Sequence, residues 1–232
     1  MPKKHSKRFR KAAEGVDKTK LYSIEEAVKE LKARVTTKFD ESIDLAVKLG
    51  IDTKQADQLV RGSLSLPHGI GKTMRVVAFC EGAEADAARA AGASEVGSAE
   101  LAAKIEGGWM EFDVAVAHPN MMRYVGKLGK VLGPKGLMPS PKSGTVTDKV
   151  ADAVREFVAG KIEFRNDKDG NIHMMVGKAS FEAQKMAENI QAAIAHIISL
   201  KPASVRKIFV QKITIASSMG PGFRINVQEI EG

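Results

Sequence analysis

Hydrophobic residues recur at helical spacing near both ends of the chain. Ser23 and Glu26 have the spacing of a capping box, and apolar residues follow every three or four positions up to Val35. A longer run of the same kind extends over residues 183–197. The pattern predicts two amphipathic helices, each with one buried face.

Regular alternation of apolar and polar residues marks a second kind of segment. Residues 42–49 alternate in this way, which indicates an antiparallel strand with one face in solvent, and residues 59–66 are expected to pair with it. Further strands are predicted at residues 161–164, 172–176, 208–215 and 223–227. Strands and helices that do not alternate regularly along the chain indicate an α+β domain.

Between Pro67 and Gly160, short apolar strands alternate with helices. Strands are predicted at residues 74–79 and 113–117, and helices at residues 84–91, 101–105 and 150–158. Such alternation implies a parallel sheet covered by helices. The predicted fold class is therefore α/β and α+β in two domains, a discontinuous α+β domain of residues 1–67 and 160–232 and an inserted Rossmann-like α/β domain of residues 68–159.

The 232-residue chain has a formal net charge of +8, which favours a polyanionic partner, either nucleic acid or an acidic membrane surface. Much of the surplus lies in the first twenty residues, which hold eight Lys and Arg against two acidic residues. This segment, residues 1–20, is predicted to be an unfolded basic arm that neutralises phosphates or, alternatively, only solubilises the chain.

The sequence lacks the features of a secreted, membrane-spanning or metal-binding protein. No apolar segment follows the basic N-terminus and none approaches the roughly 20 residues that cross a membrane, so a cytoplasmic protein without a membrane partner is expected. The single cysteine, Cys80, lies in a predicted buried strand and is expected to be a packed core thiol. The five histidines have no metal-ligand spacing, so no metal is expected.

Two patterns that suggest nucleotide binding are incomplete. Residues 69–73 match the end of a P-loop, but Leu66 stands where the first glycine belongs, and the run leads into a strand. No G-x-G-x-x-G follows the predicted strand at residues 74–79, and no serine or cysteine lies in a nucleophile motif. The sequence therefore predicts no cofactor, no small-molecule substrate and no enzymatic activity. The main rival class is a small-molecule-binding or transferase enzyme that uses the inserted domain.

A glycine- and lysine-rich segment, residues 126–144, interrupts the alternation of the inserted domain and is called the glycine-lysine segment below. Its glycines allow close approach of a partner, and its lysines supply charge directed at phosphates. The spacing of Gly133 and Gly136 also matches the G-x-x-G of a KH module, which clamps nucleotide backbone. A purely structural glycine loop fits the same residues equally well.

A second candidate contact is the turn at residues 217–222, between two predicted strands. It combines small hydroxyl side chains, the flexible thioether of Met219 and glycines. As a bare β-turn it is unremarkable, but as a contact surface it offers hydroxyl and N–H donors to phosphate or ribose. Aromatic residues make up only 5% of the chain, which argues against base stacking and favours recognition of RNA shape and backbone.

Three segments resemble the signatures of the bacterial ribosomal protein L-one family: residues 126–141, Lys38-Phe39-Asp40-Glu41 and residues 217–222. The similarity covers essentially the whole chain. It implies a protein that binds 23S rRNA, forms the mobile stalk of the large ribosomal subunit, assists release of E-site tRNA and represses translation of its own operon mRNA. It also implies a ribosome-bound protein that is a monomer when free. The alternative is an RNA-binding translational regulator that acts away from the ribosome.

Carried over by position, the resemblance assigns RNA contacts in two groups. The principal group consists of Lys38, Phe39, Ser217, Ser218, Met219 and Gly220. The second group consists of Arg165, Lys168 and His173 around a predicted hairpin, together with Lys127, Lys130 and Lys135 in the glycine-lysine segment. The small residues are expected to provide specificity through RNA shape, and the lysines and the basic arm to provide salt-dependent attraction.

Overall fold

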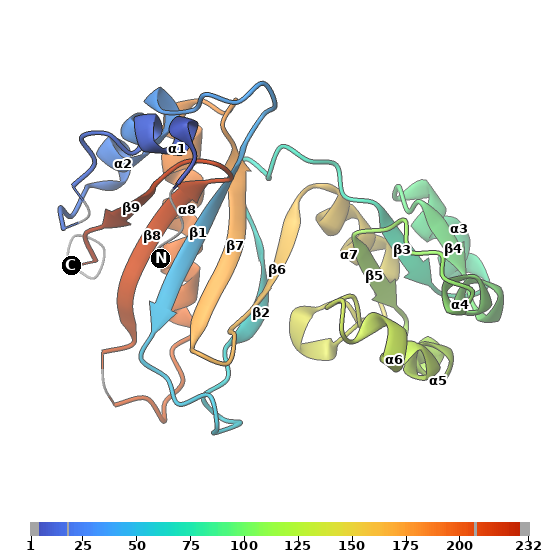
Figure 1. Ribbon diagram of the computed structural model, residues 1–232. Coiled ribbons are helices and arrows are strands. Elements are labelled where there is room, and N and C mark those ends of the chain that lie inside the picture. The colour runs from blue at the N-terminus through green and yellow to red at the C-terminus, as the bar shows by residue number, and fades with distance from the viewer. Residues whose placement is uncertain (1–4, 18, 207, 228–232) are drawn as a thin grey trace. The chain divides into compact units, whose positions relative to one another are not determined.

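The computed structural model describes residues 5–17, 19–206 and 208–227, which divide into two compact units (Figure 1). Unit 1 joins the residues up to Gly71 with those from Phe164 onwards, and unit 2 consists of residues 72–163. The chain passes from unit 1 to unit 2 and back again, and these two points are called the crossings below. The sequence pattern predicts the crossings at Pro67 and Gly160, whereas the structure places them after Gly71 and Glu163. The expected mixture of sheets and helices is confirmed.

Unit 1 is built on a four-stranded antiparallel sheet in the order β7-β1-β8-β9. The strands are β1 (Ser42–Leu49), β7 (Asn171–Lys178), β8 (Val210–Ser217) and β9 (Gly222–Ile225). The predicted alternation is present in β1, where Ile43, Leu45 and Val47 are buried on one face. Because β1 comes from the first part of the chain and its neighbours from the last, the sheet joins the two ends of the sequence.

Two helices cover the buried face of this sheet, α2 (Ile24–Ala33) and α8 (Ala183–Ser199) (Figure 1). The Ser23 hydroxyl caps α2 by accepting a hydrogen bond from the Glu26 N–H at 3.3 Å, as the capping-box spacing predicts. α8 buries an apolar stripe that includes Ile190. Full burial of a side chain of this size contributes about 1.5–3 kcal/mol, so packing of the apolar stripe holds the helix on the sheet.

The basic arm contains a helix, which corrects the prediction of an unfolded segment. Residues 1–4 and 18 lie outside the described residues, but Lys7–Ala12 form α1. The Ser6 hydroxyl caps this helix by accepting the Phe9 N–H at 3.2 Å, and the Ala12 side chain is buried. A cap and an apolar contact with the folded body stabilise a helix that is too short to persist alone.

The pairing predicted for residues 59–66 is wrong. β2 (Arg61–Ser65) pairs with β6 (Lys161–Arg165) in a separate two-stranded sheet. One edge of β1 pairs with β7 and the other with β8, so β1 has no free edge for β2.

Asn189 on α8 is a buried side chain that holds the segment before the first crossing. Its Nδ2 donates to the carbonyl oxygens of Gly69 and Val176, at 2.9 Å each. Its Oδ1 accepts the His68 N–H at 3.1 Å. Two of these hydrogen bonds tie residues 68–69 to α8, and the third ties the same amide to β7.

Unit 2 contains a three-stranded parallel sheet in the order β4-β3-β5. Its strands are β3 (Val76–Phe79), β4 (Glu95–Gly97) and β5 (Val114–Ala117), and its longer helices are α3 (Ala83–Ala90), α4 (Ala99–Glu106) and α7 (Val150–Val158). Val77 and Phe79 of β3 join a buried cluster with α4, whereas Val76 and Ala78 join another with α3 and α7. Both faces of the sheet are covered, which explains the unbroken apolar run of β3.

The glycine-lysine segment is largely helical. After η1 (Pro119–Met121) and α5 (Met122–Val125), it forms η2 (Gly126–Leu128), α6 (Gly129–Leu132) and η3 (Pro141–Ser143). Leu128 and Leu132 are buried in the core of unit 2. The Leu137 N–H donates to the Leu132 carbonyl at 3.0 Å around Gly136, whose φ of +72° is left-handed. Gly136 therefore closes the turn that follows α6, a structural role that needs no contact with nucleic acid.

Cys80 is expected to be unreactive in the folded protein. Burial and the nearby charge of Glu84 raise the pKa of its thiol to about 11. Since the thiolate is the nucleophile, iodoacetamide at pH 8 should modify the native chain about a hundredfold more slowly than the urea-unfolded chain. Mass spectrometry of timed samples measures both rates, and equal rates would contradict the buried position of Cys80.

Candidate nucleic-acid interface

A buried carboxylate joins the two segments of unit 1 that the sequence marks as contacts. Glu41 is only 1% exposed. Its Oε1 accepts a hydrogen bond from the Thr37 hydroxyl at 2.8 Å, and its Oε2 accepts the Met219 N–H at 3.1 Å. The Ser217 hydroxyl donates to the same carboxylate. One side chain therefore fixes the loop before β1 against the turn between β8 and β9, although the two segments are 178 residues apart in sequence.

Further hydrogen bonds hold the same loop and turn in place. Ser42 donates its N–H to the Ser218 hydroxyl at 3.1 Å, and Ser218 returns its own N–H to the Ser42 carbonyl at 3.0 Å. The Asp40 carboxylate accepts the N–H and the hydroxyl of Ser180, at 3.0 and 2.7 Å. The loop and the turn are thus held in place by hydrogen bonds within the chain.

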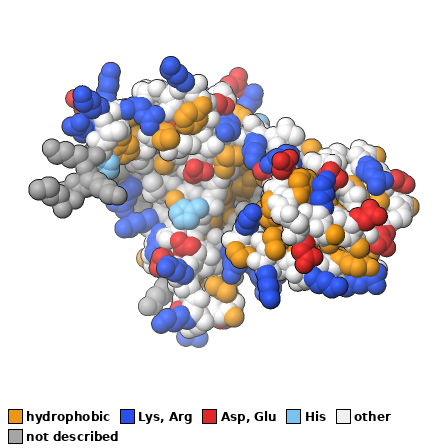
Figure 2. Space-filling view, turned by 45° about the vertical axis from the view of Figure 1, so that its right-hand side comes forward, with side chains coloured by type: hydrophobic (Ala, Val, Ile, Leu, Met, Phe, Trp, Pro, Cys, Tyr) orange, Lys and Arg blue, Asp and Glu red, His pale blue; other side chains and the backbone are white. Residues whose placement is uncertain are grey.

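Two large apolar side chains reach solvent from this ordered base. Phe39 is 51% exposed and Met219 is 46% exposed, and both Lys38 and Ser218 are also exposed beside them in sequence. These four residues are called the Phe39–Met219 surface below. Figure 2 shows exposed hydrophobic side chains next to Lys and Arg side chains at the upper end of unit 1. Apolar anchors flanked by cations suit a partner that offers both grooves and phosphates.

Ser217 and Gly220, the other two members of the principal group, support the turn from within. Ser217 is the last residue of β8, its side chain is buried, and its hydroxyl bonds to Glu41. A Cβ on Gly220 would lie 2.5 Å from the Ser217 Oγ, so only glycine fits there without displacing that hydroxyl. Direct contact of these two residues with RNA stays a prediction.

The second group of predicted contacts does not join the Phe39–Met219 surface. Arg165, Lys168 and His173 are exposed on the hairpin between β6 and β7. This hairpin lies beside the end of β1, where the Leu49 N–H donates to the Gly170 carbonyl at 2.8 Å. β1 has eight residues at about 3.3 Å each, so the hairpin tip with Lys168 and the surface are separated by the length of the strand, whereas His173 faces Ala46 near the middle of β1.

The hairpin is shaped by a second carboxylate. Hydrogen bonds from the backbone and side chain of Asn171 lower the pKa of Asp167 below its usual range, and the carboxylate also lies 3.7 Å from the His173 Nε2. The turn is therefore ordered, with Lys168 exposed at its tip. An ordered cationic tip can contact a phosphate without base specificity.

The remaining predicted lysines belong to unit 2. Lys127, Lys130 and Lys135 are exposed, on or just after the short helices of the glycine-lysine segment. The buried leucines of the segment fix the backbone that carries them. Within the described residues, no group of three or more His, Cys, Asp or Glu side chains is placed to hold a metal ion, and no helix is long and apolar enough to cross a membrane.

Glu41 belongs to the Lys38-Phe39-Asp40-Glu41 motif, but its supporting role under the turn was not predicted from the sequence. A signal was present, because the alternation of β1 extended backwards from Ile43 puts Glu41 on the buried face. A charged residue at a buried position is costly unless hydrogen bonds compensate it, so such a residue marks a site that is worth inspection. The partners themselves could not be found, because Met219 and Ser217 lie at the other end of the chain.

Glu41→Gln is expected to destabilise the protein in a pH-dependent way. Burial raises the pKa of Glu41, but its hydrogen bonds and the charge of Arg8 outweigh burial and leave the pKa below its ordinary value of 4.5. Stability from the ionised group is therefore fully present above about pH 5.5 and is lost as the pH falls through the folded-state pKa. At pH 7 the variant should lose about 1–3 kcal/mol, the usual value of hydrogen bonds to a charged group.

Urea unfolding of wild type and variant between pH 7 and pH 3.5 measures this loss. The gap between the two unfolding free energies should shrink with falling pH below 4.5. Glu25→Gln, on the exposed side of α2, is the matched control and should show no such trend. A gap that stays constant over the whole range would mean that the charge of Glu41 does not stabilise the turn.

Comparisons with known proteins all point to one family. The model of the ribosomal protein L1p/L10e family matches residues 30–221. The large ribosomal subunit protein uL1 of Kosmotoga olearia is 50% identical, with 99% of both chains covered. The proteins of the same name from Cutibacterium acnes and Clavibacter sepedonicus are each 52% identical and cover 96% and 97% of this chain, and 96% and 99% of their own length.

Relatives of this kind, found over almost the whole chain, define a structural protein of the large ribosomal subunit and not an enzyme. The mixed α/β fold, the basic charge and the ordered exposed surface of unit 1 fit that class. The chain belongs to the ribosomal protein L1p/L10e family.

Proposed function

We propose that this protein binds 23S rRNA directly through unit 1 and forms the mobile stalk of the large ribosomal subunit. The Phe39–Met219 surface is the observation that supports this most. Its apolar side chains are exposed, while the backbone beneath them is held by Glu41 and by the Ser42–Ser218 pair. A surface that is ordered before binding loses little conformational entropy when RNA arrives, so more of the contact energy appears as affinity.

Specificity and charge attraction are assigned to different residues. Phe39 and Met219 fit the shallow minor groove or the bulges of a folded RNA, with Ser218 offering a hydroxyl to phosphate or ribose. Lys38, the hairpin cations Arg165 and Lys168, and the basic arm attract phosphates without reading sequence. Affinity should therefore depend on salt, whereas the preference for one RNA over another should depend on the Phe39–Met219 surface.

Unit 2 is interpreted as a Rossmann-like α/β domain without a nucleotide. Its exposed lysines, including Lys127 and Lys130, offer phosphate contacts for the E-site tRNA whose release the stalk assists. The free protein, a monomer in the cytoplasm, also represses translation by binding an RNA site in its own operon mRNA. Both activities use polyanionic partners, in keeping with the net charge of +8.

The test is binding of the purified protein to a 23S rRNA stalk fragment and to a scrambled RNA of the same length, over salt concentrations from 50 to about 400 mM. Nanomolar affinity for the fragment with a large preference over the scrambled RNA supports the proposal. Equal and steeply salt-dependent binding to both RNAs would reduce the protein to a non-specific polycation. Cosedimentation with large subunits at one copy per particle separates a ribosomal protein from a regulator that acts elsewhere.

A further inference from the structure

The short helix α1 carries four cations on six residues. Within the described residues, three of them, Lys7, Arg10 and Lys11, form no ion pair, and α1 contains no acidic residue. Unpaired like charges on one short helix repel one another, by a few tenths of a kcal/mol per pair. α1 therefore places these three cations together with no acidic side chain of its own to compensate them.

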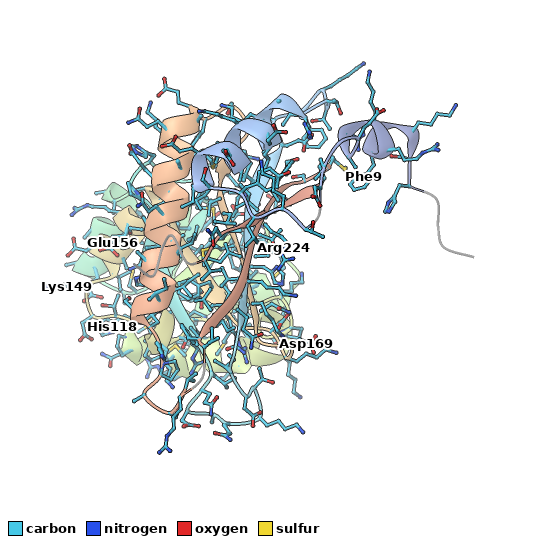
Figure 3. The ribbon with its side chains drawn as sticks, turned by 90° about the vertical axis from the view of Figure 1, so that its left-hand side faces the viewer. Phe9, His118, Lys149, Glu156, Asp169 and Arg224 are labelled. Carbon is cyan, nitrogen blue, oxygen red and sulfur yellow. The ribbon has the colours of Figure 1, made fainter. Side chains whose placement is uncertain are left out.

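The arrangement of α1 separates its apolar side from its charged side. With a rotation of about 100° per residue, Phe9 and Ala12 share one side, and Lys7, Arg10 and Lys11 share the opposite one. Ala12 is buried and Phe9 is partly buried, with its ring 4.7 Å from that of His5, so the apolar side is the covered side of α1. Figure 3 shows Phe9 pointing from α1 towards the body of unit 1. The charged side consequently faces solvent in a fixed direction.

The chain after α1 is attached to the same part of the sheet as the Phe39–Met219 surface. The Tyr22 N–H donates to the Arg224 carbonyl at 2.9 Å, and the Tyr22 ring packs edge-on against Phe223 with centroids 5.5 Å apart. Arg224 and Phe223 belong to β9, the strand that follows the Met219 turn. The chain is therefore attached next to the turn directly after the arm ends.

Arg8 connects α1 to the turn electrostatically. It lies on the flank of the helix, and its charge is among the influences that lower the pKa of Glu41, the carboxylate that holds Met219. Figures 1 and 3 show α1 beside the end of the sheet that carries the turn.

From these contacts we infer that α1 is a docked phosphate clamp of the RNA interface, a deeper feature of the proposed function on which it rests. The Phe39–Met219 surface fits the RNA, and α1 holds Lys7, Arg10 and Lys11 against the backbone beside it. The partner chemistry is a polynucleotide phosphate backbone at a fixed distance from the specific contact. A docked helix, unlike a loose tail, places its charges without a further loss of chain entropy on binding.

One variant distinguishes a docked helix from a loose tail, because it keeps every charge of α1 and removes the side chain that docks the helix. Phe9→Ser leaves all cations in place but takes away the apolar anchor of α1. Lys7→Gln, Arg10→Gln and Lys11→Gln together remove the charges and leave the anchor. Lys29→Gln, Lys185→Gln and Lys201→Gln remove the same number of exposed charges elsewhere in unit 1 and form the matched control.

Binding of the four proteins to the 23S rRNA stalk fragment and to scrambled RNA is measured over a salt series. The α1 triple variant should lower affinity for the fragment about tenfold or more at 150 mM salt and reduce the slope of log K against log salt by about 2, while the control triple changes the slope by less than about 1. Phe9→Ser should reproduce at least half of the slope change. Far-UV circular dichroism and thermal melting check that unit 1 stays folded.

Each result separates the possibilities. If Phe9→Ser binds like wild type while the α1 triple variant is weak, the charges act as a loose tail and the clamp is overturned. If the α1 triple variant binds like wild type, α1 does not contact the RNA, whatever unit 1 does. If wild type itself binds both RNAs equally, the proposed function fails and the clamp fails with it. Should Phe9→Ser unfold unit 1, Ala12→Gln, which is neutral but too large for its buried position, takes its place.

Discussion

Met219→Asp is expected to weaken binding to the 23S rRNA stalk fragment by about a hundredfold or more, equivalent to about 2.7 kcal/mol. The change replaces a half-exposed apolar anchor with a carboxylate that faces phosphate on a turn that cannot move away, since Glu41 holds the Met219 N–H at 3.1 Å. Loss of a central anchor alone often costs 2 kcal/mol, and like-charge repulsion adds to it. Filter binding or calorimetry at fixed salt measures the effect.

Two controls locate this effect. Met219→Leu keeps an apolar side chain of similar volume and should change affinity by less than about fivefold. Leu59→Asp introduces the same charge at another exposed apolar position of unit 1 and should change it little. If Leu59→Asp proved as harmful as Met219→Asp, net charge and not the Phe39–Met219 surface would govern binding.

Asn189→Leu is expected to destabilise unit 1 by about 2–4 kcal/mol. The leucine fills a similar volume but leaves the His68 N–H and the carbonyls of Gly69 and Val176 without the partner that Asn189 supplies. A buried polar group that loses its hydrogen bond costs about 1–3 kcal/mol. Urea unfolding followed by far-UV circular dichroism measures the loss.

The single tryptophan gives this experiment an internal reference. Trp109 is partly buried and packs against the core of unit 2, so its fluorescence reports that unit, whereas circular dichroism reports both. The circular dichroism transition should therefore shift more than the fluorescence transition. Gln191→Leu removes an amide from an exposed position of α8 and should have a small effect. A similar loss in both variants would show that the three hydrogen bonds of Asn189 contribute little.

Local patterns predicted the elements whose cause is local. The Ser23 cap of α2 and the alternation of β1 depend on neighbouring residues, so both are legible in the sequence. The partner strand of β2 could not be predicted from the sequence, because strand pairing depends on which sheet edges the other strands leave free. The helix α1 was not predicted for a different reason. Its basic residues indicate an unfolded arm, and only one cap and two apolar residues indicate a helix.

The candidate site also contains some residues that the sequence could predict and others that it could not. Exposed residues such as Phe39 and Met219 stand in recognisable motifs, and their neighbourhood in space follows from β1 pairing with β8. The buried position of Ser217 and the support from Glu41 depend on side-chain contacts across 178 residues, which no spacing rule contains. In the glycine-lysine segment the signal was local but was missed. Leu128 and Leu132 have helical spacing, yet the many glycines around them indicate a loop.

The joining of the two ends of the chain by Glu41 imposes an order on synthesis. Glu41 and Met219 are 178 residues apart in sequence, so the turn is synthesised long after the loop that it must meet. The contiguous unit 2 can complete its core earlier, as domains do during translation. A nascent chain in which Met219 has not yet been made therefore lacks the hydrogen bonds that hold the Phe39–Met219 surface in place.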